Sequence, residues 1–126
     1  MAGGYRELVV WQKAMDLVVI VYKFTEKFPK SEMYGLTSQM RRSAVSIPSN
    51  IAEGSKRQTK ADFRNFLAIA LGSAAELETQ LLIANRLKFG DDTIYSNAEG
   101  FLSEILRMLS TLVIRTNDSC LSTYDY

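Results

Sequence analysis

The stretch TSQMRRSAVSIPSNIAEG, from Thr37 to Gly54, places two kinds of surface on one segment of chain. In steps of three and four residues, apolar side chains follow one stripe and polar side chains follow another, which is typical of an amphipathic α-helix. Pro48 lies inside this helix, where its ring removes a backbone N–H and crowds the carbonyl of Ala44. We therefore expect the helix to kink or to break at Pro48.

Three further segments show the same helical spacing on either side of this stretch. Pro29 ends the first segment, and Thr59 with Asp62 resembles a capping box at the start of the third. The four predicted helices span about residues 8–28, 32–53, 59–87 and 91–115. No stretch shows the alternation of a strand. We predict an all-α protein, an antiparallel up-down-up-down four-helix bundle over residues 1–116, followed by a polar C-terminal tail over residues 117–126.

The third helix has the most regular apolar seam, and the first and fourth helices have two apolar stripes each. The seam consists of Phe63, Leu67, Ala70, Ala74, Leu77, Leu81 and Ala84. An isolated bundle does not bury the apolar width of the first and fourth helices, so we expect other copies of the chain to cover the excess. The candidate residues of this homo-oligomer interface are Tyr5, Trp11, Met15, Leu102, Leu106 and Leu109.

The composition of this 126-residue chain is that of an ordinary globular domain, with 47% hydrophobic and 23% charged residues. Its uninterrupted apolar runs are shorter than the roughly 20 residues of a membrane helix, and no secretory leader is visible. We expect a cytoplasmic protein without membrane contact. The single cysteine, Cys120, is interpreted as a bystander thiol of a reducing compartment.

The chain contains no histidine, which is the commonest general base and metal ligand. Glu53, Glu76 and Glu78 are the remaining acid or base candidates near the polar stripe. Carboxylate metal sites in helix bundles usually add Glu-x-x-His motifs, and phosphate-binding glycine loops are missing as well. We therefore predict no catalytic residues, no metal, no cofactor and no enzymatic activity.

The polar stripe of the second helix has two interpretations: it is a binding surface, or it is a structural network. Buried polar groups are normally hydrogen-bonded, and polar side chains on the third helix follow a matching spacing, so we expect a network between the two helices. Arg42 paired with Glu76 is one such contact. The network residues are Gln39, Arg42, Ser46, Asn50, Glu53, Ser73, Glu76 and Gln80.

A local excess of positive charge lies between Arg41 and Arg64. This segment contains six basic and two acidic residues, although the net charge of the whole chain is only +1. Much of it belongs to the turn GSKRQTK, Gly54 to Lys60, which precedes the third helix. Helix N-termini and clustered cations suit phosphate groups. The candidate anion or RNA contacts are Arg41, Lys56, Arg57, Lys60 and Arg64, although such a turn is also compatible with a merely solvated loop.

Four motifs resemble a known family, the four-helix-bundle proteins encoded within intervening sequences of bacterial 23S rRNA genes, to which the accessory protein of diversity-generating retroelements is related. The motifs are YRELVVWQKAMDL, SQMRRSAVSIPSNIAEGSKRQTKADF, FLAIALGSAAELETQLLIA and EILRMLSTL.

The resemblance implies a bundle that assembles into a ring, commonly a homopentamer, with a poorly defined activity. The retroelement protein is strongly basic and this chain is nearly neutral, so the chain resembles the rRNA branch. The partners we expect are other copies of the chain and RNA; the alternative is a protein-protein interaction scaffold without a nucleic-acid role.

Overall fold

Four α-helices make up the fold in the computed structural model, which describes residues 4–125 and the side chains of residues 4–117. They are α1 (Val9–Thr25), α2 (Leu36–Ser55), α3 (Lys60–Arg86) and α4 (Asp92–Asp125). Two short 3-10 helices, Gly4–Glu7 and Lys30–Glu32, precede α1 and α2. No strand occurs among these described residues, which confirms the predicted all-α class.

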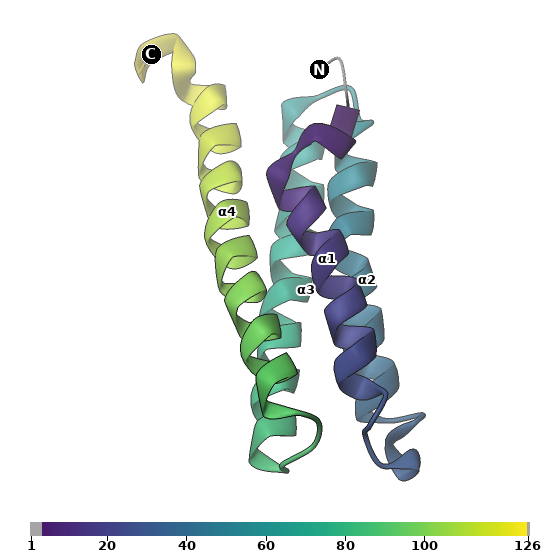
Figure 1. Ribbon diagram of the computed structural model, residues 1–126. Helices are drawn as coiled ribbons and strands as arrows, with labels where there is room; N and C mark the ends of the chain where they lie inside the picture. The colour runs from purple at the N-terminus through teal and green to yellow at the C-terminus, as the bar shows by residue number, and fades with distance from the viewer. Residues whose placement is uncertain (1–3, 126) are drawn as a thin grey trace.

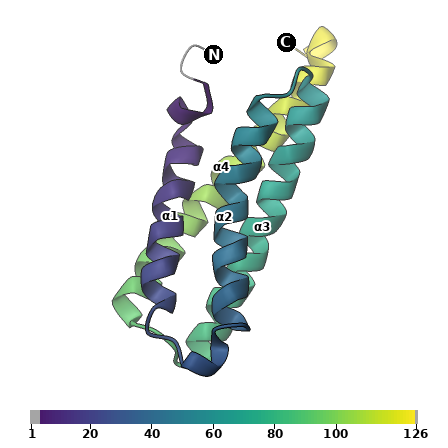
Figure 2. The same ribbon diagram turned by 90° about the vertical axis from the view of Figure 1, so that its right-hand side faces the viewer.

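The helices run alternately up and down along the bundle (Figure 1). α1 packs on α2 and α4, and α3 packs on the same two helices, whereas α1 and α3 occupy diagonal corners without mutual contact. Figure 2 shows α1 and α3 on opposite sides of the molecule. The predicted antiparallel bundle is thus confirmed for a single chain.

Local chemistry fixes the starts of α3 and α4. The Thr59 hydroxyl accepts a hydrogen bond of 3.1 Å from the backbone N–H of Asp62, as the capping motif predicted. The Asp91 carboxylate accepts hydrogen bonds from the N–H groups of Thr93 and Ile94, at 2.8 and 3.0 Å. These caps satisfy backbone donors that the first turn of a helix leaves unpaired.

α2 continues through Pro48 without a break, so the break considered from the sequence does not occur. The Pro48 ring is buried between the helices, and the helix runs on to Ser55. α4 extends beyond Arg115, where the sequence placed its end, to Asp125. The boundary of the polar tail at residue 117 stays a prediction, and the Cys120 side chain lies outside the residues whose side chains the structure describes.

The core follows the predicted seams closely. All seam residues of α3 are buried except Phe63, which is half-buried near the start of the helix. α1 contributes five apolar side chains to the same core: Val10, Ala14, Leu17, Val21 and Phe24.

In α4 the structure contradicts part of the predicted oligomer interface. Leu102 and Leu109, which were expected at an oligomer interface, are 1% and 0% exposed inside the single chain. Because α4 packs on both α1 and α3, its two apolar stripes are needed within one bundle.

Candidate nucleic-acid interface

The segment Gly54 to Lys60 covers the end of α2, the turn and the first residue of α3, and it brings three exposed cations to the N-terminus of α3. We call Lys56, Arg57 and Lys60 of this segment the basic turn. Gly54 lets the turn approach α3 closely, because a Cβ at this position would lie 2.7 Å from the Cβ of Phe66. The cations therefore lie near the end of α3 whose backbone N–H groups favour negative charge.

Aromatic rings lie under two of these cations. The Arg57 guanidinium lies 4.7 Å from the centre of the Phe66 ring, and its Nη2 forms an ion pair of 2.8 Å with Glu53. The Lys56 ammonium lies 5.8 Å from the centre of the Tyr5 ring. Glu53, which was expected in the α2–α3 network, therefore contacts the basic turn instead.

The structure does not bring Arg41 to the basic turn. Arg41 precedes Lys56 by about four helical turns, or about 22 Å along the helix axis. Its Nε donates a hydrogen bond of 2.9 Å to the Thr25 hydroxyl, and its guanidinium lies 4.5 Å from the centre of the Tyr22 ring. Arg41 thus fixes α2 against α1. Arg64 lies one turn into α3, is half-buried and makes interactions of its own.

A polar groove of about 450 Å³ runs between α2 and α3, and its lining includes five residues of the predicted network. The hydroxyls of Ser46 and Ser73 lie 2.8 Å apart and join the two helices. The Asn50 amide donates to the carbonyl and hydroxyl oxygens of Ser46, at 2.8 and 2.9 Å. The groove is lined by Gln39, Arg42, Ser43, Ser46, Ser73 and Glu76.

The contact expected between Arg42 and Glu76 is replaced by another. Glu76 accepts a hydrogen bond of 2.9 Å from Ser43, a residue outside the predicted network. Arg42 is exposed, and no ion pair joins it to another described residue. Gln80 is 5% exposed, and its Oε1 has no hydrogen-bond partner among the residues that the structure describes. Arg42 and Ser43 are adjacent in the sequence but project from α2 in different directions. A small difference in the rotation of α2 about its axis therefore decides which of the two side chains contacts Glu76.

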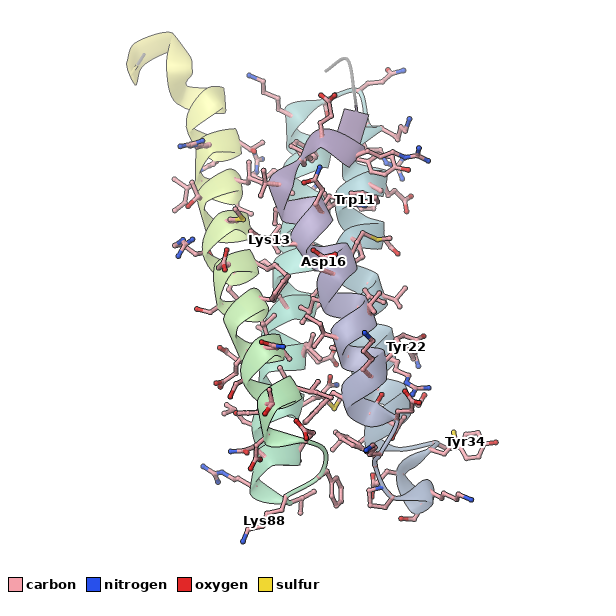
Figure 3. The ribbon with its side chains drawn as sticks, in the orientation of Figure 1. Trp11, Lys13, Asp16, Tyr22, Tyr34 and Lys88 are labelled. Carbon is pink, nitrogen blue, oxygen red and sulfur yellow. The ribbon has the colours of Figure 1, made fainter. Side chains whose placement is uncertain are left out.

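Both α1 and α3 carry exposed apolar side chains outside the bundle core. On α1 they are Met15, Val19 and Tyr22, at 43%, 54% and 43% exposure. Trp11 and Tyr5 are half-buried and contact each other edge to face, with ring centres 5.2 Å apart. Figure 3 shows Trp11 and Tyr22 along α1.

The periodicity of α3 predicts its buried seam but does not indicate an apolar outward face, which consists of Ile69 and Ile83 and which we call the α3 face. Ile69, Leu82 and Ile83 are 51%, 48% and 43% exposed, and Gly72 has open space beside it. By length and a mean hydropathy of 1.4, α3 is the one described helix that could cross a membrane, and 33% of its most apolar stretch is buried. Since α3 also supplies the bundle core, its remaining apolar surface is suited to contact with another protein chain.

Two titratable groups away from the basic turn are shifted by their neighbours. A hydrogen bond from Lys13, 2.9 Å from the Glu104 carboxylate, together with the lysine charge lowers the pKa of Glu104. Burial, with a hydrogen bond to Glu99, raises the pKa of Tyr95. Within the described part of the chain, no three Asp, Glu or Cys side chains come together as metal ligands. Neither shifted group lies near a constellation suited to acid-base catalysis.

Comparison with known proteins places this geometry in a family. A family model described as 23S rRNA-intervening sequence protein matches residues 6–111. Among solved structures, the chain is similar to a protein of unknown function from the S23 ribosomal protein family of Bacteroides thetaiotaomicron VPI-5482. The two are 30% identical with a TM-score of 0.74, over 83% of this chain and 98% of that one. None of the curated proteins matches the chain. The chain thus belongs to the 23S rRNA-intervening sequence protein family.

Proposed function

We propose that this chain is a non-enzymatic, cytoplasmic homo-oligomer, encoded within an intervening sequence of a bacterial 23S rRNA gene, which binds RNA through the basic turn. The observation that carries the RNA role is the placement of three exposed cations beside the N-terminus of α3. Phosphate groups are attracted both by the lysine and arginine charges and by the unpaired N–H groups of the helix end.

The two outward apolar faces support the homo-oligomer. The α1 face (Met15, Val19 and Tyr22) and the α3 face (Ile69 and Ile83) belong to helices on diagonal corners of the bundle. Contact between the α3 face of one chain and the α1 face of the next is heterologous, and such contacts close into rings when the rotation between subunits permits. We propose a ring of this kind, with the pentamer of the family resemblance as its expected size.

Assembly would repeat the basic turn once in every subunit. Three cations give only weak attraction to a polyanion at physiological salt, because each contact is screened. Several turns on one particle can contact one RNA together, and linked contacts bind far more tightly than any single contact. The ring and the basic turn are therefore parts of one mechanism in this proposal.

The RNA role is tested by charge-matched variants. Replacement of Lys56, Arg57 and Lys60 with serine removes three cations from the basic turn. The control is the replacement of Lys23, Lys27 and Lys30 with serine, which removes three exposed cations from the opposite end of the bundle. Fluorescence anisotropy with labelled RNA at low salt should show a large loss of affinity only in the first variant. Equal losses in both would refute a specific role for the basic turn.

The subunit contact is tested by a second matched pair. Ile69→Lys places a charge on the α3 face, and Ile114→Lys places one on α4 at a similar initial exposure of 58%. Because both positions are exposed in the single chain, neither change should unfold the bundle. Sedimentation velocity should show subunit dissociation for Ile69→Lys alone, and an unchanged particle for both variants would exclude the α3 face.

The alternative function is a protein-binding scaffold without an RNA role. The polar groove between α2 and α3 favours it, since Arg42, which forms no ion pair with another described residue, suits an acidic protein segment. A partner held by this groove would remain bound after nuclease treatment. Arg42→Gln would release such a partner and leave an RNA bound to the basic turn unaffected.

A further inference from the structure

We propose that Arg57 is a stacking platform for an unpaired base, so that the basic turn binds single-stranded RNA in preference to duplex RNA. This inference rests on the proposed RNA-binding function and adds the class of RNA. It follows from the way in which two neighbouring helices hold the Arg57 side chain.

Arg57 is restrained from two directions. Glu53, one turn earlier in α2, forms the 2.8 Å ion pair with its Nη2. Phe66, from α3, lies beneath the guanidinium at 4.7 Å from the ring centre to Cζ. Long exposed arginine side chains normally move among many rotamers, and these two contacts hold the planar group before any ligand arrives.

The restrained guanidinium remains accessible. The Arg57 side chain is 44% exposed although Phe66 covers one side of it and Glu53 one edge. A large part of the Arg57 side chain therefore stays open to solvent beside these two contacts. RNA bases that are not paired stack on arginine planes as well as on aromatic rings, so this surface suits a base.

The lysines of the basic turn have a different chemistry. Lys56 and Lys60 present compact ammonium groups on flexible stems, which attract phosphates but give a base no plane to stack on. Phosphate attraction alone does not favour a single strand, because a duplex carries the higher density of negative charge. Stacking on Arg57 requires a base whose face is free, and in a duplex the neighbouring base pairs cover both faces. The preference for a single strand therefore depends on Arg57.

Arg41 provides a matched control. Its guanidinium also lies on an aromatic ring, 4.5 Å from the centre of Tyr22, and its Nε is engaged by Thr25. It lies about four helical turns from Lys56. Arg57→Lys and Arg41→Lys each preserve the charge and remove one stacked guanidinium, so the comparison separates stacking at the basic turn from a general effect of losing arginine.

The experiment measures anisotropy of a labelled oligouridine, alone and hybridised to oligoadenosine, with the wild-type protein and both variants. We expect the wild type to prefer the single strand by at least about fivefold, the lower end of what base stacking contributes. Arg57→Lys should abolish this preference and leave duplex affinity and its salt dependence unchanged, whereas Arg41→Lys should keep it. Phe66→Leu, which retains an apolar side chain under Arg57, should weaken the preference by a second route.

The inference is overturned if the wild type binds both probes equally, or if Arg57→Lys keeps the full preference for the single strand. In either case a loss of binding on replacing the three cations of the basic turn would leave the proposed RNA-binding function intact. If the wild type binds neither probe at low salt, the proposed function fails, and the inference fails with it.

Discussion

Replacement of Gly90 with alanine should destabilise the bundle strongly, because this glycine closes the α3–α4 turn against an immobile ring. Gly90 has a φ of +80°, which side-chain-bearing residues adopt at a cost of about 1–2 kcal/mol. An added Cβ would lie 2.4 Å from Cε1 of Phe24. Phe24 is 1% exposed and packs against Phe28 and Tyr95, with ring centres 5.1 and 6.1 Å away.

The ring of Phe24 therefore cannot turn aside without disturbing its neighbours, and overpacking of this kind costs about 1–3 kcal/mol. Together with the backbone strain, Gly90→Ala should lower the free energy of unfolding by about 2–5 kcal/mol. For a chain of this size the melting temperature should fall by roughly 3–6 °C for each kcal/mol.

The assay is urea denaturation followed by far-UV circular dichroism, at one protein concentration because association changes apparent stability. Gly100→Ala is the control, since Gly100 lies inside α4 with open space beside it and alanine should stabilise the helix by about 0.5–1 kcal/mol. A Gly90→Ala variant within about 1 kcal/mol of the wild type would refute the packing argument for this turn.

Three further substitutions test a hydrogen bond between α2 and α3, the proline inside α2, and the ion pair between α1 and α4. Ser73→Ala removes the contact with the Ser46 hydroxyl and should cost about 0.5–1.5 kcal/mol in urea denaturation; an unchanged midpoint would show that this contact contributes nothing. Pro48→Ala restores a helix N–H and removes some packing of the buried ring, and the free energy of unfolding should rise by about 1–2 kcal/mol. A lower free energy of unfolding would show that the packing of the ring contributes more than the restored N–H. Lys13 lowers the pKa of Glu104, so their pair stabilises the fold above the ordinary glutamate pKa and loses this effect as the pH falls through the lowered value. Glu104→Gln should therefore make the melting temperature less dependent on pH between about pH 6 and pH 3, and an unchanged acid profile would contradict this.

The helices, their order and most of the core could be predicted because these features depend on local spacing. Seam residues recur every three or four positions, and the caps at Thr59 and Asp91 act within their own helix turn. The continuity of α2 through Pro48 could not be predicted, since the packing of neighbouring helices decides whether a proline breaks a helix.

The candidate sites were predicted less well because they depend on rotation of one helix against another. The sequence grouped Arg41 with the basic turn, and the structure places it against Thr25 of α1. The contact between Arg57 and Phe66 joins residues nine positions apart across a turn, which no helical periodicity indicates. The apolar width of α4 suggested an interface, yet Leu109 is buried within its own chain.

RNA binding by the purified protein at two salt concentrations tests the central claim most directly. If the basic turn neutralises phosphates, affinity must fall steeply as salt rises, and loss of its three cations should reduce the slope of log K against log salt by about 2. Binding that is absent at low salt, or that does not respond to salt, would contradict the account and leave the polar groove as the candidate site of a protein partner.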